Sequence, residues 1–443
     1  MTVRTRYLIL HGLRWMPVGL MIPVLVLLAQ ERGMTLAQIG LITAAQGFVV
    51  LGLELPTGGL ADTIGRRPVL LLAALVNLAS LAFLVVADQF WMFVVIFAMQ
   101  GVFRALDSGP LDSWYVDATL AENPSASFES GLSRAGVVSG IAIGGGALLS
   151  GALVALDPIP AVSALTTPIL VAVVLQTITV TAILTLLREP PRHSRTRFAA
   201  TLRGVPAVVT DALGLLRRSR VLAALVGVEL CWAFGMMTFE VFFPVRLSEV
   251  VGDPATAASI LGPVGSAAWL ASAAGAALVP LLVRRLGPAW SGLTLQLGQA
   301  LAVLAIGLFT GPAGAITAYL LCYTLHGAVN PVYSGLLHRQ ADATNRTTVA
   351  SLSSMAGQPA GAVGSITLAA IAQATTVRTA ILAGTIPLAL AALGYLAARL
   401  TPPPTTLAST PDHAGEPDSP AVAPGAAAGP ALTSGPPEVA ITQ

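Results

Sequence analysis

The chain has 443 residues, of which 55% are hydrophobic and only 10% are charged, and its mean hydropathy is +0.79. Because soluble globular proteins carry about 25% charged residues, this composition excludes a soluble globular enzyme. A helix that crosses a hydrocarbon core of about 30 Å needs about 20 apolar residues, so the hydrophobic content is enough for about twelve such helices. The net charge of +2 gives no basic surface that would indicate binding of nucleic acid.

Apolar runs separated by Arg, Pro and Gly predict the membrane-spanning helices. In the first half of the chain they lie at 7–29, 37–61, 67–87, 91–116, 129–156 and 164–187. In the second half they lie at 221–247, 257–283, 289–309, 313–337, 348–372 and 378–399. The sequence therefore predicts an all-α integral membrane protein with twelve transmembrane helices in two six-helix bundles.

The organisation of the chain follows from these spans. We expect an N-terminal bundle at 1–188, a cytoplasmic linker loop at 189–220, a C-terminal bundle at 221–400 and a disordered cytoplasmic tail at 401–443, where ten prolines prevent a packed core. The two bundles show a distant repeat, since Pro23-Val24 and Gly33 in the first are echoed by Pro244-Val245 and Gly252 in the second. Such an arrangement places a substrate near the midplane, between the bundles.

The arginines predict the orientation, because all 23 basic residues are arginine. With a cytoplasmic amino terminus, 18 of them lie on the cytoplasmic face, and only Arg32, Arg246 and Arg378 lie outside. Arg14 and Arg104 lie within spans. Since cytoplasmic loops carry the excess of arginine, we expect a multi-pass protein of the cell membrane with both termini in the cytoplasm.

A motif lies between the second and third spans, where residues 58–68 read Gly-Gly-Leu-Ala-Asp-Thr-Ile-Gly-Arg-Arg-Pro. The pattern G-x-L-x-D-x-x-G-R-R resembles motif A of the major facilitator superfamily. The resemblance implies that fold and a secondary active transporter that works by alternating access. It also implies a charge network that joins the two bundles on the cytoplasmic side, the conformational latch, with these members: Gly58, Asp62, Gly65, Arg66, Arg67 and Asp117.

The fifth span carries glycines in the pattern Gly136-x-x-x-Gly140-Ile141-x-x-Gly144-Gly145. It resembles the antiporter motif G-x-x-x-G-P-x-x-G-G of the superfamily, with Ile141 in place of proline. The stretches 54–58 and 113–117 are similar to a bacterial drug-efflux branch. These resemblances favour proton-coupled efflux of small hydrophobic compounds or drugs, although close helix packing explains the glycines equally well.

Ionisable side chains within spans are candidates for proton coupling, because each costs about 2.5–3.5 kcal/mol at the membrane centre and so usually faces a cavity or a partner. Our candidates are Glu54, Asp107, Arg14 and Arg104, of which Glu54 is the first choice, with Arg14 as its expected neighbour. A permanent ion pair that only holds helices together is the alternative for Glu54 and for Asp107.

Polar and aromatic groups of the seventh and tenth spans are candidates for a substrate pocket. We expect these residues to line it: Trp232, Glu229, Glu240, His326 and Asn330. Glu229 and Glu240 are eleven residues apart, so they share one helix face, where one of them is placed to meet a cationic substrate. Ordinary packing and hydrogen bonds between helices are the alternative.

The sequence contains no phosphate-binding G-x-x-x-x-G-K-[ST], zinc-binding H-E-x-x-H or G-x-S-x-G motif. We therefore expect no catalytic residue, metal or cofactor, and the expected partners are a small-molecule substrate, protons and the lipid bilayer. The oligomeric state is open, with a monomer expected. Two alternatives remain: a proton-coupled nutrient uptake symporter, and a membrane-embedded enzyme or sensor that acts on lipid.

Overall fold

The computed structural model describes residues 1–58, 60–123, 128–189, 210, 214–340 and 346–399, and within them it is helical. The helices of the first half are α1 (Val3–Met21), α2 (Leu25–Glu31), α3 (Leu36–Gly58), α4 (Leu60–Ile64), α5 (Arg66–Val86), α6 (Phe90–Asp107), α7 (Pro110–Glu122), α8 (Glu129–Leu156) and α9 (Thr167–Leu186). Those of the second half are α11 (Arg220–Glu240), α12 (Phe242–Val251), α13 (Pro254–Leu286), α14 (Pro288–Leu308), α15 (Pro312–His338), α16 (Arg346–Ala374) and α17 (Val377–Arg399).

Eleven helical segments in the described ranges are long and apolar enough to cross a membrane, and some consist of two helices in line, such as α1 with α2. The 27-residue helix α15 is not one of these eleven, but it packs against α13 and α14, which are. The predicted all-α membrane architecture is therefore confirmed. Most of the predicted linker and the whole tail from 401 lie outside the described residues, so the predicted boundaries of the two bundles stay a prediction.

Three of the predicted spans consist of two helices each in the structure. The first breaks between α1 and α2, beside Pro23, and the seventh breaks at Val241, between α11 and α12. The fourth breaks between α6 and α7, where Gly109 has φ +92° and Pro110 begins the new helix. A side chain other than glycine is strained at this φ, and proline is favoured as the first residue of a helix.

The repeat predicted from the sequence is visible in the helices that follow two of these breaks. In the first half α2 is a short helix, and Gly33 two residues after its end has φ +81°. In the second half α12 is the short helix, and Gly252 at its C-cap has φ +87°. The two halves therefore begin with the same broken helix and the same left-handed glycine.

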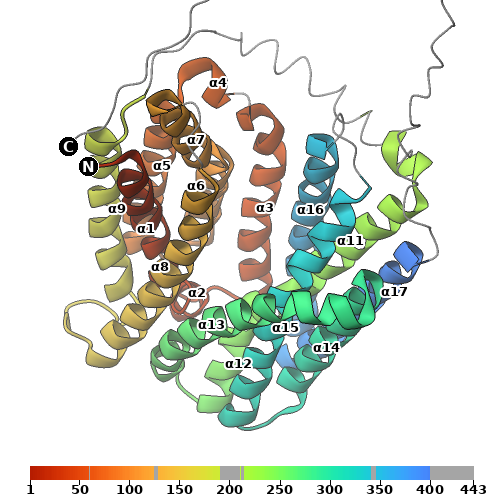
Figure 1. Cartoon of the computed structure of the whole chain (residues 1–443). Helices are drawn as coiled ribbons and strands as arrows, with labels where there is room; N and C mark the ends of the chain where they lie inside the picture. Colours follow the sequence, from red (N-terminus) through yellow and green to blue (C-terminus); the bar gives the residue numbers. More distant parts are fainter. Residues whose placement is uncertain (59, 124–127, 190–209, 211–213, 341–345, 400–443) are drawn as a thin grey trace, which may run out of the picture. The chain divides into compact units, whose positions relative to one another are not determined.

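The set of helices has two ends, the N-face and the far face. The N-face is the side where α1 begins and α4 lies, and the far face is the side where α5 and α8 end (Figure 1). Within the first half α1 packs on α8 and α9, and α5 packs on α6 and α9; within the second, α11 packs on α16 and α17, and α14 packs on α15 and α17. The halves meet through α3 with α16 and through α8 with α13.

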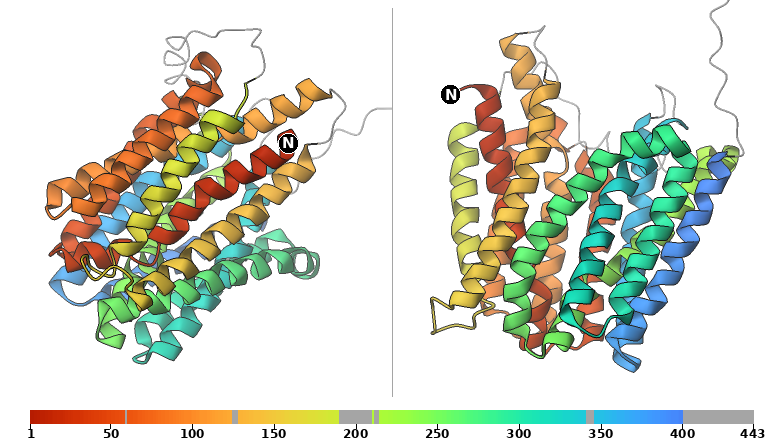
Figure 2. Two further views of the ribbon diagram at one scale, coloured as in Figure 1. Left: turned by 90° about the vertical axis from the view of Figure 1, so that its left-hand side faces the viewer. Right: turned by 60° about the horizontal axis from the view of Figure 1, so that its bottom comes forward.

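The contact between α8 and α13 lies in their far-face halves and includes several small residues. A Cβ built on Gly262 would lie 2.6 Å from Cα of Gly151 and 2.8 Å from the carbonyl oxygen of Ala147. Toward the N-face the two helices diverge, as both views show (Figures 1 and 2). Cβ atoms on Gly136 and Gly140 would meet nothing within 4 Å.

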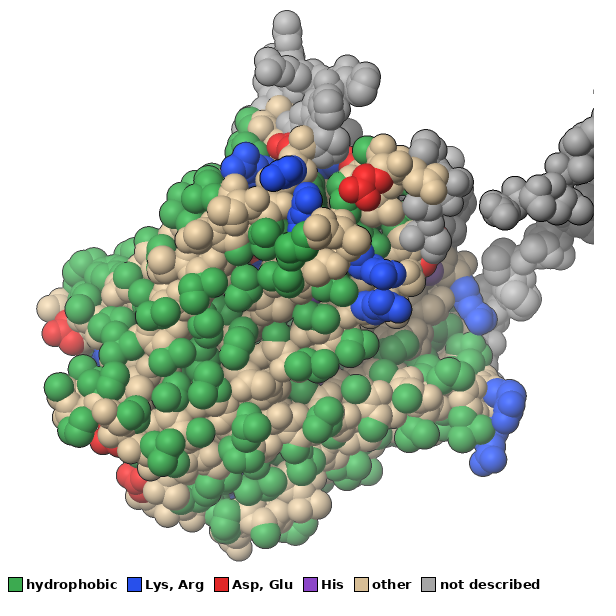
Figure 3. Space-filling model, turned by 60° about the vertical axis from the view of Figure 1, so that its left-hand side comes forward, with side chains coloured by type: hydrophobic (Ala, Val, Ile, Leu, Met, Phe, Trp, Pro, Cys, Tyr) green, Lys and Arg blue, Asp and Glu red, His purple; other side chains and the backbone are tan. Residues whose placement is uncertain are grey.

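The outer surface is apolar, as expected for helices in lipid. Figure 3 shows hydrophobic side chains spread over one face and basic side chains gathered toward one end of it. Large hydrophobic residues are exposed far beyond what a soluble surface carries, such as Leu270 at 71% and Leu301 at 64%. These side chains lie where the acyl chains of a bilayer would cover them.

Candidate functional site

The motif between α3 and α5 forms a turn at the N-face that begins α5. Gly65 has φ +117° and is the N-cap of α5, so the glycine is required by the backbone. The guanidinium of Arg66 forms an ion pair with Asp117 of α7, and both residues are among the predicted members of the latch. Gly58 ends α3 and Asp62 lies in α4, but the surroundings of these two residues lie outside what the structure describes.

The described partners of the two motif arginines all belong to the first half. The backbone N–H of Arg66 donates to Glu189 Oε1 at 2.9 Å, and Arg67 Nη2 donates to the carbonyl oxygen of Leu184 at 2.7 Å. The turn therefore joins α5 to α7 and to the end of α9. A link between the two halves through this motif stays a prediction.

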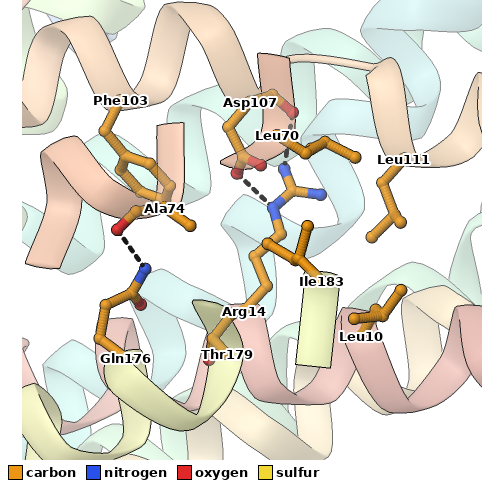
Figure 4. Close-up of a pocket in the computed structure, with 10 residues that line it drawn as sticks. All are labelled: Leu10, Arg14, Leu70, Ala74, Phe103, Asp107, Leu111, Gln176, Thr179 and Ile183. Carbon is orange, nitrogen blue, oxygen red and sulfur yellow. Dashed lines mark hydrogen bonds and ion pairs between the residues drawn. The ribbon is translucent and has the colours of Figure 1, made fainter. Parts of the chain in front are cut away.

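Arg14 and Asp107 form an ion pair inside the first half (Figure 4). Arg14 Nη2 also donates to the carbonyl oxygen of Asp107 at 3.1 Å, a group that is free because α6 ends at this residue. The pair borders a cavity of about 20 Å³ whose polar wall includes Gln176 and Thr179, which is room for about one water molecule. Arg14 therefore pairs with Asp107, not with Glu54 as expected.

Glu54 lies instead at the boundary between the halves. Its Oε1 accepts a hydrogen bond of 2.5 Å from Ser354 of α16. Its Oε2 is buried and has no hydrogen-bond partner in the described part of the chain. The carboxylate of the first half is thus bonded directly to a helix of the second.

Arg104 and Glu240 extend this polar boundary. Arg104 of α6 lies within electrostatic range of both Glu54 and Glu240 of α11. Arg104 and Glu240 are both exposed to solvent. Glu240 also accepts a hydrogen bond of 2.7 Å from Tyr323 of α15.

A cavity of about 250 Å³ lies between α11, α15, α16 and α17. Four of the five residues predicted for a substrate pocket line it, namely Glu229, Trp232, His326 and Asn330, whereas Glu240 does not. The ring of His326 stacks on Trp232 with 5.5 Å between centroids and 16° between planes. One helix pair, α11 and α15, thus brings together residues almost one hundred positions apart in the sequence.

The same cavity contains residues that the sequence analysis missed, Tyr333, Ser353 and Tyr395. Tyr333 is seven residues after His326, two turns along the same face of α15, and this spacing could have identified it. Tyr395 is completely buried and its hydroxyl has no hydrogen-bond partner among the described residues. Nothing in the sequence around Tyr395 marks it, because its position depends on how α17 packs.

The described features of these sites are an ion pair, hydrogen bonds and a cavity, all of which suit binding. Among the residues described, no group of three or more His, Cys, Asp and Glu side chains is arranged to hold a metal ion. In the first half Asp107 is paired with Arg14, and in the second half Glu229 lies in a cavity with aromatic rings.

Comparison with known proteins places the chain in a broad group. The family model described as "Major Facilitator Superfamily" matches residues 7–365, while no curated protein matches the chain by sequence. A crystal structure of the nucleoside transporter NupG aligns with a TM-score of 0.75 at 14% identity, over 91% of this chain and 100% of that one. At this identity the likeness shows the fold alone.

A second solved structure is a bacterial homologue of the human lysosomal transporter Spinster, in an inward-facing and occupied conformation. It aligns with a TM-score of 0.69 at 15% identity, over 90% of this chain and 97% of that one. Both neighbours therefore share nearly the full length of the described helices.

Proposed function

The chain belongs to the major facilitator superfamily, and we propose that within it the protein exports small hydrophobic compounds in exchange for protons by alternating access. It is a multi-pass membrane protein and a secondary transporter of this type, not an enzyme, so the alternative of a lipid-acting enzyme is set aside. The compound class, the direction and the coupling ion are the parts that we propose.

The contacts between the halves support alternating access. The tight contact of α8 with α13 lies toward the far face, and the same helices diverge toward the N-face. Moving one half against the other about this boundary would open the far face and close the N-face, as expected for rocking bundles. A solute bound between the halves would then meet one side of the membrane at a time.

The observation that carries proton coupling is the position of Glu54. Its hydrogen bond to Ser354 joins the two halves, so a relative movement of the halves must break it. Its second oxygen has no described partner, and Arg104 lies within electrostatic range. A carboxylate whose partners change with conformation binds a proton with different affinity in each state, and that difference couples protons to movement.

The experiment uses the purified full chain in liposomes with an acidic interior, with ethidium as a cationic probe and chloramphenicol as a neutral one. A proton antiporter accumulates a transported probe in the acidic compartment, whereas a symporter drives it into the alkaline one. We expect accumulation in the acidic compartment. Accumulation in the alkaline compartment would establish the uptake alternative. If neither probe moves, with the interior acidic or with the interior alkaline, the transport proposal is refuted.

Replacing Glu54 tests the coupling residue. We expect Glu54→Gln to abolish gradient-driven accumulation and to retain probe binding, because the amide keeps the shape but cannot exchange a proton. The matched control is Glu249→Gln, an exposed carboxylate of α12 beside Arg246, which should transport normally. Full gradient-driven transport by Glu54→Gln would eliminate Glu54 as the coupling residue.

A further inference from the structure

Glu229 is the carboxylate of the second-half cavity, and none of the described residues that line this cavity is an arginine. Its described neighbours are the hydroxyl groups of Ser353 and Tyr333, which lie 3.1 Å from each other. The described basic side chains in the cavity wall are the imidazoles of His326 and His338, and neither is a hydrogen-bond partner of Glu229. Because removing a carboxylate from water without a counter-charge is costly, the cavity has a place for a permanent positive charge that no described arginine supplies.

The carboxylates Asp107 and Glu54 of the first half, in contrast, have arginines nearby. Arg14 pairs with Asp107 inside its small cavity, and Arg104 lies near Glu54. The space beside Asp107 is thus already occupied by a guanidinium group. Glu229 has no arginine beside it in the described cavity wall, so a cationic ligand could serve as its partner.

The other residues that line the cavity indicate which uncharged groups a bound cation would carry. Val228, Val329 and Leu337 are aliphatic, and Trp232, Tyr333 and Tyr395 contribute aromatic rings. Pockets of this kind hold ligands through apolar contact and fix their orientation with a few polar groups. Aromatic side chains also attract cations through the faces of their rings.

Three unpaired polar atoms lie in the same walls. They are Nε1 of Trp232, Nδ1 of His326 and the hydroxyl of Tyr395, each buried and without a hydrogen-bond partner in the described ranges. A buried polar atom without a partner costs free energy, and a ligand with polar groups of its own would remove that cost. The cavity thus offers hydrogen bonds as well as a negative charge.

We propose that this cavity is the binding site for an organic cation, a protonated or quaternary amine on an aromatic or aliphatic body. The ammonium group lies against Glu229, and the body lies between the rings of α11, α15 and α17. The inference deepens the proposed export function, because it names the class of compound that the exporter carries.

The test measures equilibrium binding to the purified full chain without any gradient, at pH 8 so that imidazole side chains of ordinary pKa, about 6.5, are neutral. The probes are benzyltrimethylammonium and benzylsulfonate, which share a benzyl body and carry opposite charges. We expect the cation to bind and the sulfonate to bind at least about tenfold more weakly, which corresponds to about 1.4 kcal/mol. Equal affinity for the two probes would overturn the proposal.

Variants assign the binding to this cavity. Glu229→Gln should weaken cation binding at least about tenfold, and Trp232→Leu should weaken it about threefold or more through loss of a ring. Glu31→Gln, an exposed carboxylate at the end of α2, is the control and should bind as the wild type does. Thermal unfolding of each variant identifies any that is misfolded.

The outcomes separate this inference from the proposed function. Wild-type cation affinity in folded Glu229→Gln, or in folded Trp232→Leu if the first variant does not fold, refutes the cavity as the site. If that result comes with Glu54-dependent transport, the export function stands and only the site is wrong. If cation binding depends on Glu229 but no compound moves under a gradient, the site stands and the export function fails.

Discussion

At the scale of residues, the structure gives each buried charge a distinct surrounding. Arg14 and Asp107 are 16% and 8% exposed at their side chains and satisfy each other. A pair of this kind adds little net stability, but loss of one member leaves the other buried and unpaired. The pair is therefore expected to be structural, and Glu54 remains the candidate for coupling.

A variant of the Arg14–Asp107 pair tests whether the pair has only a structural role. Asp107→Leu should lower the free energy of unfolding by about 3–5 kcal/mol, because it leaves the Arg14 guanidinium without its partner. The double variant Arg14→Leu with Asp107→Leu should recover most of that loss and should still transport. Thermal unfolding and transport of the double variant are the measurements, and loss of transport despite restored stability would make the pair part of the mechanism.

The ion pair between Arg66 and Asp117 leads to the opposite expectation. Its side chains are 18% and 47% exposed, so Asp117→Asn should change the free energy of unfolding by less than about 1 kcal/mol. If the predicted latch operates, the same change should still slow transport. Glu122→Gln in the same helix is the control, and transport at the wild-type rate by Asp117→Asn would remove this pair from the latch.

For Asp62, whose side chain the structure does not describe, the expectation rests on the motif. Asp62→Asn belongs in the same transport assay, with slower cycling expected.

At the scale of elements, glycines decide which helices can touch. In the predicted antiporter-like motif of α8, a Cβ at Gly144 would contact the second half, at 3.2 Å from Ser266 Oγ, while Gly136 and Gly140 face open space. The closest approach uses Gly151, outside the motif. The motif alone therefore gives no account of how α8 and α13 pack.

Gly262→Ala is the corresponding prediction. Its methyl group would lie 2.6–2.8 Å from backbone atoms of α8, which cannot move aside as a side chain does, so we expect the far-face contact to separate. Labelling of a far-face cysteine that is buried in the wild type should then accelerate. Gly140→Ala, which adds the same methyl to open space, should leave labelling unchanged, and identical labelling in both variants would contradict the role of this contact.

At the scale of the whole membrane protein, the arginines predict the orientation. Basic residues concentrate at the N-face, and this face should be cytoplasmic. In a background with Cys231→Ser and Cys322→Ser, an impermeant thiol reagent in intact cells should label Asp88→Cys at the far face. It should spare Ile64→Cys and Arg217→Cys unless the membrane is opened. Labelling of Ile64→Cys and Arg217→Cys from opposite sides would refute the topology.

The sequence predicted the helices and their order well, because the length of an apolar run depends on the membrane and not on neighbouring helices. It failed on partners, such as Ser354 for Glu54, because the rotation of one helix against another depends on contacts across the whole fold. It also missed the break at Gly109, whose φ is a property of the tertiary structure.

The glycine contact of Gly151 with Gly262 has a consequence for the response to salt. Uncharged backbone meets uncharged backbone there, so dissolved ions have no charge to screen. Closing the N-face, in contrast, brings exposed arginines such as Arg284 and Arg285 nearer to the basic residues of the first half, and this repulsion weakens as ionic strength rises. Added salt should therefore favour the N-face-closed form by acting on one side of the membrane only.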